Sequence, residues 1–131
     1  MFQEFLEAPY VVRRDDTPTP QEIYDRVAQH LITQGQRAAY GVSCIYHASN
    51  GDKCAIGVLI SDEAYLPEME GLTAYSLIRR HGKGLPSWFQ ANIDLLEDLQ
   101  EVHDHKSSWY DIRETLRVFA VKHGFRPYGE V

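Results

Sequence analysis

Two cysteines and a histidine lie close together in one stretch of the sequence. Residues 43–62 read SCIYHASNGDKCAIGVLISD and contain Cys44, His47 and Cys54. With His103, these side chains could supply the two thiolates and two imidazoles that tetrahedral zinc prefers. The spacing argues against zinc, because structural sites use two tight pairs and Cys54 has no second ligand close by. We therefore expect no cofactor, and a zinc site formed by these four side chains is the alternative.

Cys54 is also the candidate nucleophile of the chain. A thiol at the start of a helix has a lowered pKa, and the stretch CAIGVLI could begin a short helix at this residue. His103 would then act as the base and Asp104 as the group that orients it. The same stretch is apolar, and an unpaired cysteine is among the most buried residue types, so a small core thiol is the competing interpretation. A disulfide between Cys44 and Cys54 is not expected in a reducing compartment.

Two further groups of residues could carry chemistry. The triplet His103, Asp104 and His105 could bind a divalent metal, but it also suits the carboxyl end of a helix, where cationic side chains are favoured. The acidic stretches 62–63 and 68–71 contain neighbouring carboxylates that could serve as acid and base or hold a cation. Solvated acidic loops are common, so each group has a purely structural interpretation as well.

Helices are predicted on both sides of this central stretch. Thr19 can cap a helix, Pro20 fits its first position, and Glu22 completes a capping box. Apolar residues then recur at four-residue spacing until Gly35, which predicts a helix over residues 20–34. Three further helices are predicted, at about residues 73–81, 86–103 and 108–123.

The pair Asn50-Gly51 is the strongest signal for a β-hairpin. With these two residues at the turn, His47 would lie opposite Cys54. The fold class that follows is mainly α with a minor β element: about four helices packed around a short central β-hairpin. One globular domain is predicted over residues 20–125, preceded by an arm (1–19) and followed by a tail (126–131).

Composition limits the classes of function. The chain has 131 residues, 19 acidic and 13 basic, with a net charge of −6. Bulk nucleic-acid binding is not expected, because it requires clustered lysine and arginine. No apolar run is long enough to span a membrane, and the amino terminus lacks the pattern of a secretory signal. These features predict a cytoplasmic protein.

Several motifs occur in a recognisable order. They are Cys44-x-Tyr46, Gly51-x-x-Cys54-Ala55-Ile56-Gly57-x-Leu59-Ile60, Asp62, Tyr65, Met69-Glu70-Gly71, Leu99-Gln100 and His103-Asp104. This succession resembles small uncharacterised proteins of tailed bacteriophages and of bacteria that carry prophages. The resemblance covers about residues 20–123 and implies a phage-encoded accessory protein acting in the host cytoplasm. It implies no particular activity.

Three functions follow from these observations. The first is interaction with a host or phage protein, with homo-oligomerisation through the aromatic arm 1–19. The alternative is a small cysteine- or metal-dependent hydrolase that uses Cys54 with His103 and Asp104. Whether the protein is an enzyme is therefore open. The third is capture of a small ligand between the hairpin and the third helix, close to the aromatic residues Tyr46, Tyr65 and Trp88.

Overall fold

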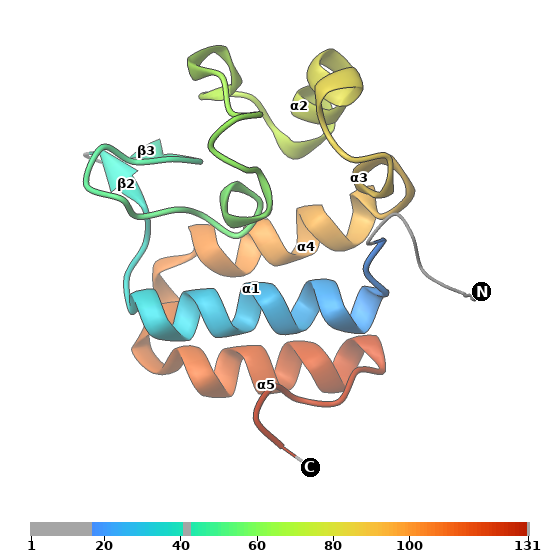
Figure 1. Ribbon diagram of the computed structural model, residues 1–131. Coiled ribbons are helices and arrows are strands. Elements are labelled where there is room, and N and C mark those ends of the chain that lie inside the picture. The colour runs from blue at the N-terminus through green and yellow to red at the C-terminus, as the bar shows by residue number, and fades with distance from the viewer. Residues whose placement is uncertain (1–16, 41–42, 131) are drawn as a thin grey trace, which may run out of the picture.

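A computed structural model describes residues 17–40 and 43–130, and it is mainly helical (Figure 1). The described α-helices are α1 (Pro20–Gln34), α2 (Ala74–His81), α3 (Trp88–Ala91), α4 (Ile93–Asp104) and α5 (Ile112–His123). Short 3-10 turns are η1 (Gly57–Leu59), η2 (Pro67–Met69), η3 (Gly82–Gly84) and η4 (Lys106–Asp111). Two strands of two residues, β2 (Ala39–Tyr40) and β3 (Ser43–Cys44), pair antiparallel with Ala39 opposite Cys44.

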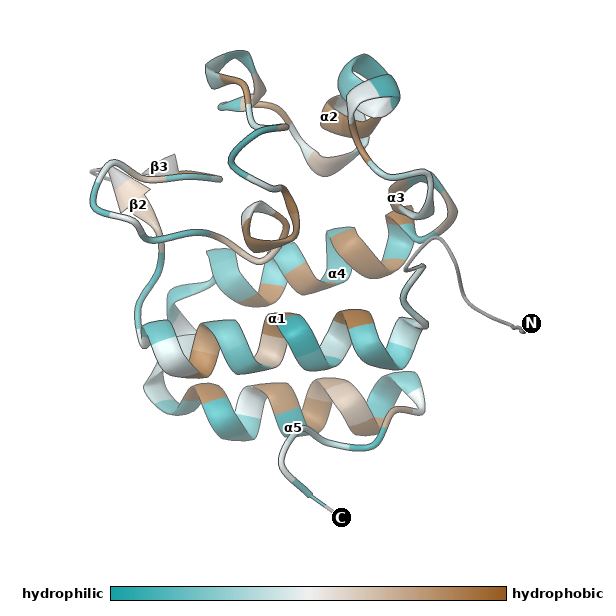
Figure 2. Cartoon of the chain, in the orientation of Figure 1, coloured by the Kyte–Doolittle hydropathy of each residue, from teal (hydrophilic) through white to brown (hydrophobic). Residues whose placement is uncertain are grey.

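The three long helices form the base of the molecule. α1 packs against both α4 and α5, and α2 packs on α4 (Figure 1). Each long helix carries hydrophobic and hydrophilic residues along its length (Figure 2), as expected for helices with one face in a core. Buried residues from α1 to α5 form one core cluster, which the loop residues Tyr46, Cys54, Ile56 and Ile60 join. The irregular segment between β3 and α2 is therefore part of the core.

The predicted start and end of the first helix are confirmed. The Thr19 hydroxyl accepts a hydrogen bond from the Glu22 N–H at 3.1 Å, and the Glu22 carboxylate accepts one from the Thr19 N–H at 2.9 Å. Gly35 ends the helix with a φ of +75°. The second predicted helix is also confirmed, with Thr73 as the cap of α2.

The third predicted helix is divided in two at Asn92, and the fourth begins four residues later than predicted. Asn92 separates α3 from α4, because its side chain donates to the Trp88 carbonyl oxygen at 2.8 Å and occupies an acceptor that a continuous helix would use. The last helix begins at Ile112, capped by Asp111, and the residues before it form the 3-10 turn η4. The prediction of about four helices thus becomes five α-helices among the described residues.

The predicted central hairpin is wrong. His47 makes a single antiparallel bridge, and its partner is Lys53 and not Cys54. The turn takes three residues, 49–51, with a φ of +95° at Gly51, which shifts the register by one residue from that of a two-residue turn. The Asn-Gly signal therefore located the turn correctly but not its length.

A side chain from α1 covers the outer edge of this bridge, on the side of Lys53 that faces away from His47. The Gln34 amide accepts from the Lys53 N–H at 2.8 Å and donates to the Lys53 carbonyl oxygen at 3.0 Å. His30 donates to the same oxygen at 2.8 Å. Because both backbone groups of Lys53 bond to α1, they are not available to a further strand on that side.

The carboxyl-terminal tail is fixed to α1. The Gln21 amide exchanges two hydrogen bonds with the backbone of Arg126, both at 2.9 Å. The Tyr24 hydroxyl donates to the Leu116 carbonyl oxygen at 3.0 Å and accepts from the Tyr128 N–H at 3.1 Å. Most of the arm predicted over residues 1–19 lies outside the described residues. No helix in the described ranges is both long and apolar enough to cross a membrane.

Candidate functional site

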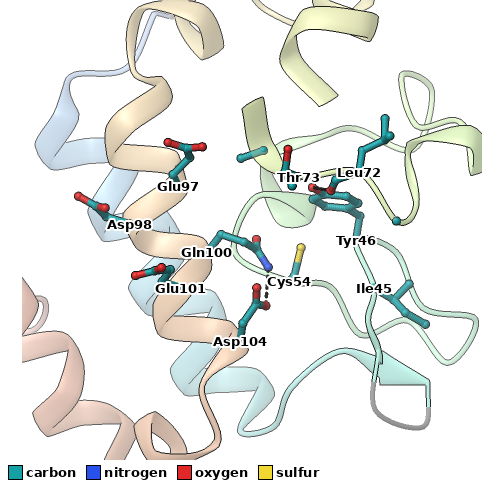
Figure 3. A pocket seen from close by; sticks show the side chains of 12 residues that line it. Ile45, Tyr46, Cys54, Leu72, Thr73, Glu97, Asp98, Gln100, Glu101 and Asp104 are labelled. Carbon is teal, nitrogen blue, oxygen red and sulfur yellow. Dashed lines mark hydrogen bonds between the residues drawn. The ribbon is translucent and has the colours of Figure 1, made fainter. Parts of the chain in front are cut away.

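A pocket of about 530 Å³ lies between the loop after β3, the segment before α2, and α4 (Figure 3). It is lined by Ile45, Tyr46, Cys54, Gly71, Leu72, Thr73, Ala74, Glu97, Asp98, Gln100, Glu101 and Asp104. Gln100 and Asp104 point from α4 toward Cys54, whereas Asp98 and Glu101 point away from it (Figure 3). The pocket thus has an inner part around Cys54 and an outer part along the acidic surface of α4.

Cys54 lies at the inner wall as a protonated thiol. Its side chain is buried, and burial raises the pKa of the thiol to about 12, against the smaller opposing effect of a hydrogen bond from Gly57. That bond runs from the Gly57 N–H to Sγ at 3.3 Å. Cys54 is not the first residue of an α-helix, since only the 3-10 turn η1 follows it. The interpretation of Cys54 as a small core thiol is confirmed.

His103 is completely buried on α4, and both of its ring nitrogens are engaged. Nε2 accepts a hydrogen bond from the Ala38 N–H at 2.9 Å, so this nitrogen carries no proton. Nδ1 therefore carries the proton and donates it to the Asp104 carboxylate at 2.8 Å. No lone pair on the imidazole remains to accept a proton from Cys54. The predicted His103–Asp104 pair exists, but it holds the backbone of Ala38.

Gln100 joins α4 to the turn that carries Cys54. Its amide oxygen accepts from the Ile56 N–H at 3.1 Å, and its amide nitrogen donates to the Asp104 carboxylate at 2.8 Å. No role was predicted for Gln100 beyond its place in a motif. Its position three residues before His103, on the same face of the helix, was the available signal.

Glu70 connects the loop after β3 to the segment before α2, next to the pocket. One carboxylate oxygen accepts from the Tyr46 N–H at 2.9 Å, and the other accepts from the His47 N–H at 3.1 Å and from the Tyr65 hydroxyl at 2.6 Å. Burial and, second, this carboxylate raise the pKa of Tyr65 to about 12. The Tyr46 hydroxyl donates to the Leu72 carbonyl oxygen at 2.6 Å. The carboxylate of Glu70, predicted as a catalytic or cation-binding group, thus holds two loops together.

His47, the residue after Tyr46, is also fixed in place. Its Nε2 donates to the carbonyl oxygens of Gly57, at 2.7 Å, and Ile60, at 3.1 Å. Its ring stacks on Tyr65 with centroids 4.2 Å apart. Nδ1 lies 3.7 Å from an exposed Asp62 carboxylate oxygen. The imidazole that was a candidate zinc ligand is thus oriented by two backbone carbonyls.

The predicted zinc site can be followed for three of its four residues, because the side chain of Cys44 lies outside the described part of the chain. His47 and His103 each direct a ring nitrogen to a backbone group, and Cys54 is a buried thiol. In the ranges that the structure describes, no group of three or more His, Cys, Asp or Glu side chains could hold a metal ion.

The pocket as a whole carries one sign of charge. Four carboxylates of α4 line it, and no lysine, arginine or histidine does. Asp104 is engaged by His103 and Gln100, and Asp98 lies 3.2 Å from Nε2 of His123. Glu97 and Glu101 stand one helical turn apart, so their charges reinforce each other.

The small-ligand site expected near Tyr46, Tyr65 and Trp88 coincides only in part with this pocket. Tyr46 lines it, whereas Tyr65 donates its hydroxyl hydrogen to Glu70 and Trp88 belongs to the core. Five of the motif residues behind the phage resemblance line this pocket: Tyr46, Cys54, Gly71, Gln100 and Asp104. Glu70 and His103 hold the backbone next to it, and the Gly57 carbonyl oxygen accepts from His47.

The fold and the site define a small, mainly α-helical protein with an acid-lined surface pocket whose inner polar groups are hydrogen-bonded to the backbone. Comparisons with protein-family models, with curated proteins and with solved structures each found no match.

Proposed function

We propose that this chain is a small phage-type accessory protein that acts by binding a host or phage protein in the host cytoplasm. The pocket on α4 is the proposed contact, and the partner supplies a lysine or arginine side chain to it. The observation that carries the proposal is the lining: four carboxylates, no cationic side chain, and an apolar floor that includes Ile45, Tyr46 and Leu72.

A long cationic side chain fits both parts of this lining. Its aliphatic stem can cover the apolar residues while its charged head lies at the carboxylates of Glu97 and Glu101. The acidic surface would also steer a basic partner to the pocket and increase the association rate. An anionic partner would be repelled, which agrees with the expectation of no bulk nucleic-acid binding.

The alternative function, a cysteine- or metal-dependent hydrolase, has less support from the geometry. A nucleophile needs a base within hydrogen-bond reach, and Nε2 of His103 is occupied by the Ala38 N–H. The pKa of Cys54 is raised to about 12, which opposes formation of the thiolate. The inner residues thus maintain the shape of the pocket, and the outer carboxylates are the groups available to a ligand.

Fluorescence anisotropy tests the proposal directly. The probe is a labelled decapeptide with two arginines flanked by leucines, and its counterpart has glutamate in place of arginine. We expect binding of the arginine peptide only, weakening as salt is raised from low to physiological concentration. The double variant Glu97→Gln/Glu101→Gln should lower the affinity about five-fold, the effect of removing two partly exposed ion pairs.

Asp94→Asn is the matched control, because Asp94 is an exposed carboxylate of the same helix that does not line the pocket. It should leave the affinity unchanged. Equal effects of the control and the double variant, or equal binding of the arginine and glutamate peptides, would contradict the assignment of the pocket.

A further inference from the structure

A second hollow, of about 410 Å³, lies at the carboxyl end of α2, and its rim is basic. Arg79, Arg80, His81 and Lys83 line it, and no acidic side chain does. Arg79 is held in place, since it donates to the Tyr75 hydroxyl at 3.1 Å and its guanidinium lies 5.5 Å from the centre of that ring. Arg80 and Lys83 form no ion pair with any residue in the described ranges.

The floor of this hollow is apolar. Ala64, Leu66 and Met69 line it, and Leu66 is 43% exposed, one of few large apolar side chains exposed in the described chain. A basic rim around an apolar floor matches a segment that carries both carboxylates and large apolar side chains. A simple anion would leave the floor uncovered, and a purely apolar ligand would leave the cations unpaired.

The chain itself contains such a segment. Residues 1–12, MFQEFLEAPYVV, include two carboxylates, Glu4 and Glu7, and no lysine or arginine. Phe5 and Leu6 lie between these carboxylates in sequence, and Phe2 lies two residues before Glu4. We propose that residues 1–12 dock into the basic hollow of the same chain, with the glutamates at Arg80 and Lys83 and the apolar side chains on the floor.

The chain before α1 is long enough to reach this hollow. Pro20, at the beginning of α1, shares a small hollow with Ala91 at the end of α3, and only Leu85–Ser87 separate α3 from η3. Ten residues from Glu7 to Thr17 can span at most about 35 Å, which is about the diameter of a globular domain of this length. Because a short tether gives an effective concentration in the millimolar range, docking within one chain is favoured over docking on a second copy.

Zero-length cross-linking of the full chain tests the contact. A carbodiimide joins a carboxylate to an amine only when the two are in contact, and Lys83 is the one amine in the basic rim. Mass spectrometry should find Glu4 or Glu7 joined to Lys83 in at least about five-fold excess over Lys106 and Lys122. Lys53 and Asp62, 3.3 Å apart, are the internal positive control. In a mixture of unlabelled and ¹⁵N-labelled protein, the linked peptides should be of one isotope only.

Substitutions in the hollow provide a second measurement. Leu66→Ser/Arg80→Gln should lower the yield of the Lys83 product about five-fold. The matched control is Arg113→Gln/Val118→Ser, which changes two exposed residues of α5. It should leave the yield of the Lys83 product unchanged. Equal yields at the three lysines, or no arm product when the Lys53–Asp62 product forms, would overturn the proposal. Mixed-isotope products would overturn it in favour of arm exchange between two copies. The outcome does not depend on ligand binding at the acidic pocket.

Discussion

The close approach of η1 to the Tyr46 loop makes Gly57→Ala the sharpest test of the described geometry. A Cβ at Gly57 would lie 2.7 Å from the carbonyl carbon of Tyr46 and closer still to its oxygen, and both are backbone atoms that cannot rotate away. Ordinary contacts between such atoms begin at about 3.4 Å, so one backbone segment must move by close to 1 Å. Gly57 is thus required for space and not for an unusual φ.

The displacement would also break hydrogen bonds on both sides of the contact. The Tyr46 carbonyl oxygen accepts from the Cys54 N–H at 3.3 Å, and the Gly57 carbonyl oxygen accepts from His47 at 2.7 Å. Overpacking costs about 1–3 kcal/mol and each of the two lost hydrogen bonds about 1 kcal/mol, so the free energy of unfolding should fall by about 3–5 kcal/mol. This loss is a large part of the free energy of unfolding of a typical domain, which is about 5–15 kcal/mol.

Urea unfolding followed by circular dichroism measures the effect. With a slope of about 2 kcal/mol per molar urea, the midpoint should fall by about 1.5–2.5 M. Gly82→Ala is the control, because a Cβ there meets nothing within 4 Å and φ is −57°. It should change the free energy of unfolding by about 0.5 kcal/mol or less. A Gly57→Ala variant as stable as the control would refute the close approach.

Three further predictions follow from single side chains. Glu70→Gln should lower the free energy of unfolding in urea by about 2–3 kcal/mol, because an amide donor replaces one acceptor oxygen, while Glu68→Gln in the same loop should be neutral within about 0.5 kcal/mol. Cys54 should resist iodoacetamide at neutral pH in the native protein and react after unfolding, as read from its own peptide by mass spectrometry. Burial lowers the pKa of His30, so the unfolded chain binds the extra proton first as pH falls through about 6.5, and stability is lost toward acid. His30→Gln should make the free energy of unfolding less dependent on pH between about 5 and 7, and an unchanged dependence would show that His30 does not contribute.

The sequence patterns predicted those features of the fold whose interacting residues are close together in the chain. The Thr19–Glu22 capping box and Gly35 defined α1 because every partner lies within a few residues. The Asn50-Gly51 turn was located but its register was not, since Gln34, 19 residues from Lys53, fixes the edge of Lys53 that faces α1. No local pattern records such a contact.

In the candidate site, too, short-range features were predictable and long-range contacts were not. The apolar character of CAIGVLI was enough to predict a buried Cys54. The role of His103 was not predictable, because its partner Ala38 is 65 residues away in sequence. Glu70 was recognised only as part of an acidic loop, whereas its function in the fold depends on backbone N–H groups more than 20 residues earlier.

The Gln34–Lys53 contact also bears on self-association. A glutamine side chain carries an N–H donor group next to a carbonyl acceptor, so it can pair with one residue as a neighbouring strand would. Lys53 would otherwise present an unpaired N–H and carbonyl at the outer edge of the bridge, which is the template that an edge strand offers to another chain. By ending α1 with this glutamine, the fold closes that edge with a helix and leaves no room there for intermolecular β-pairing.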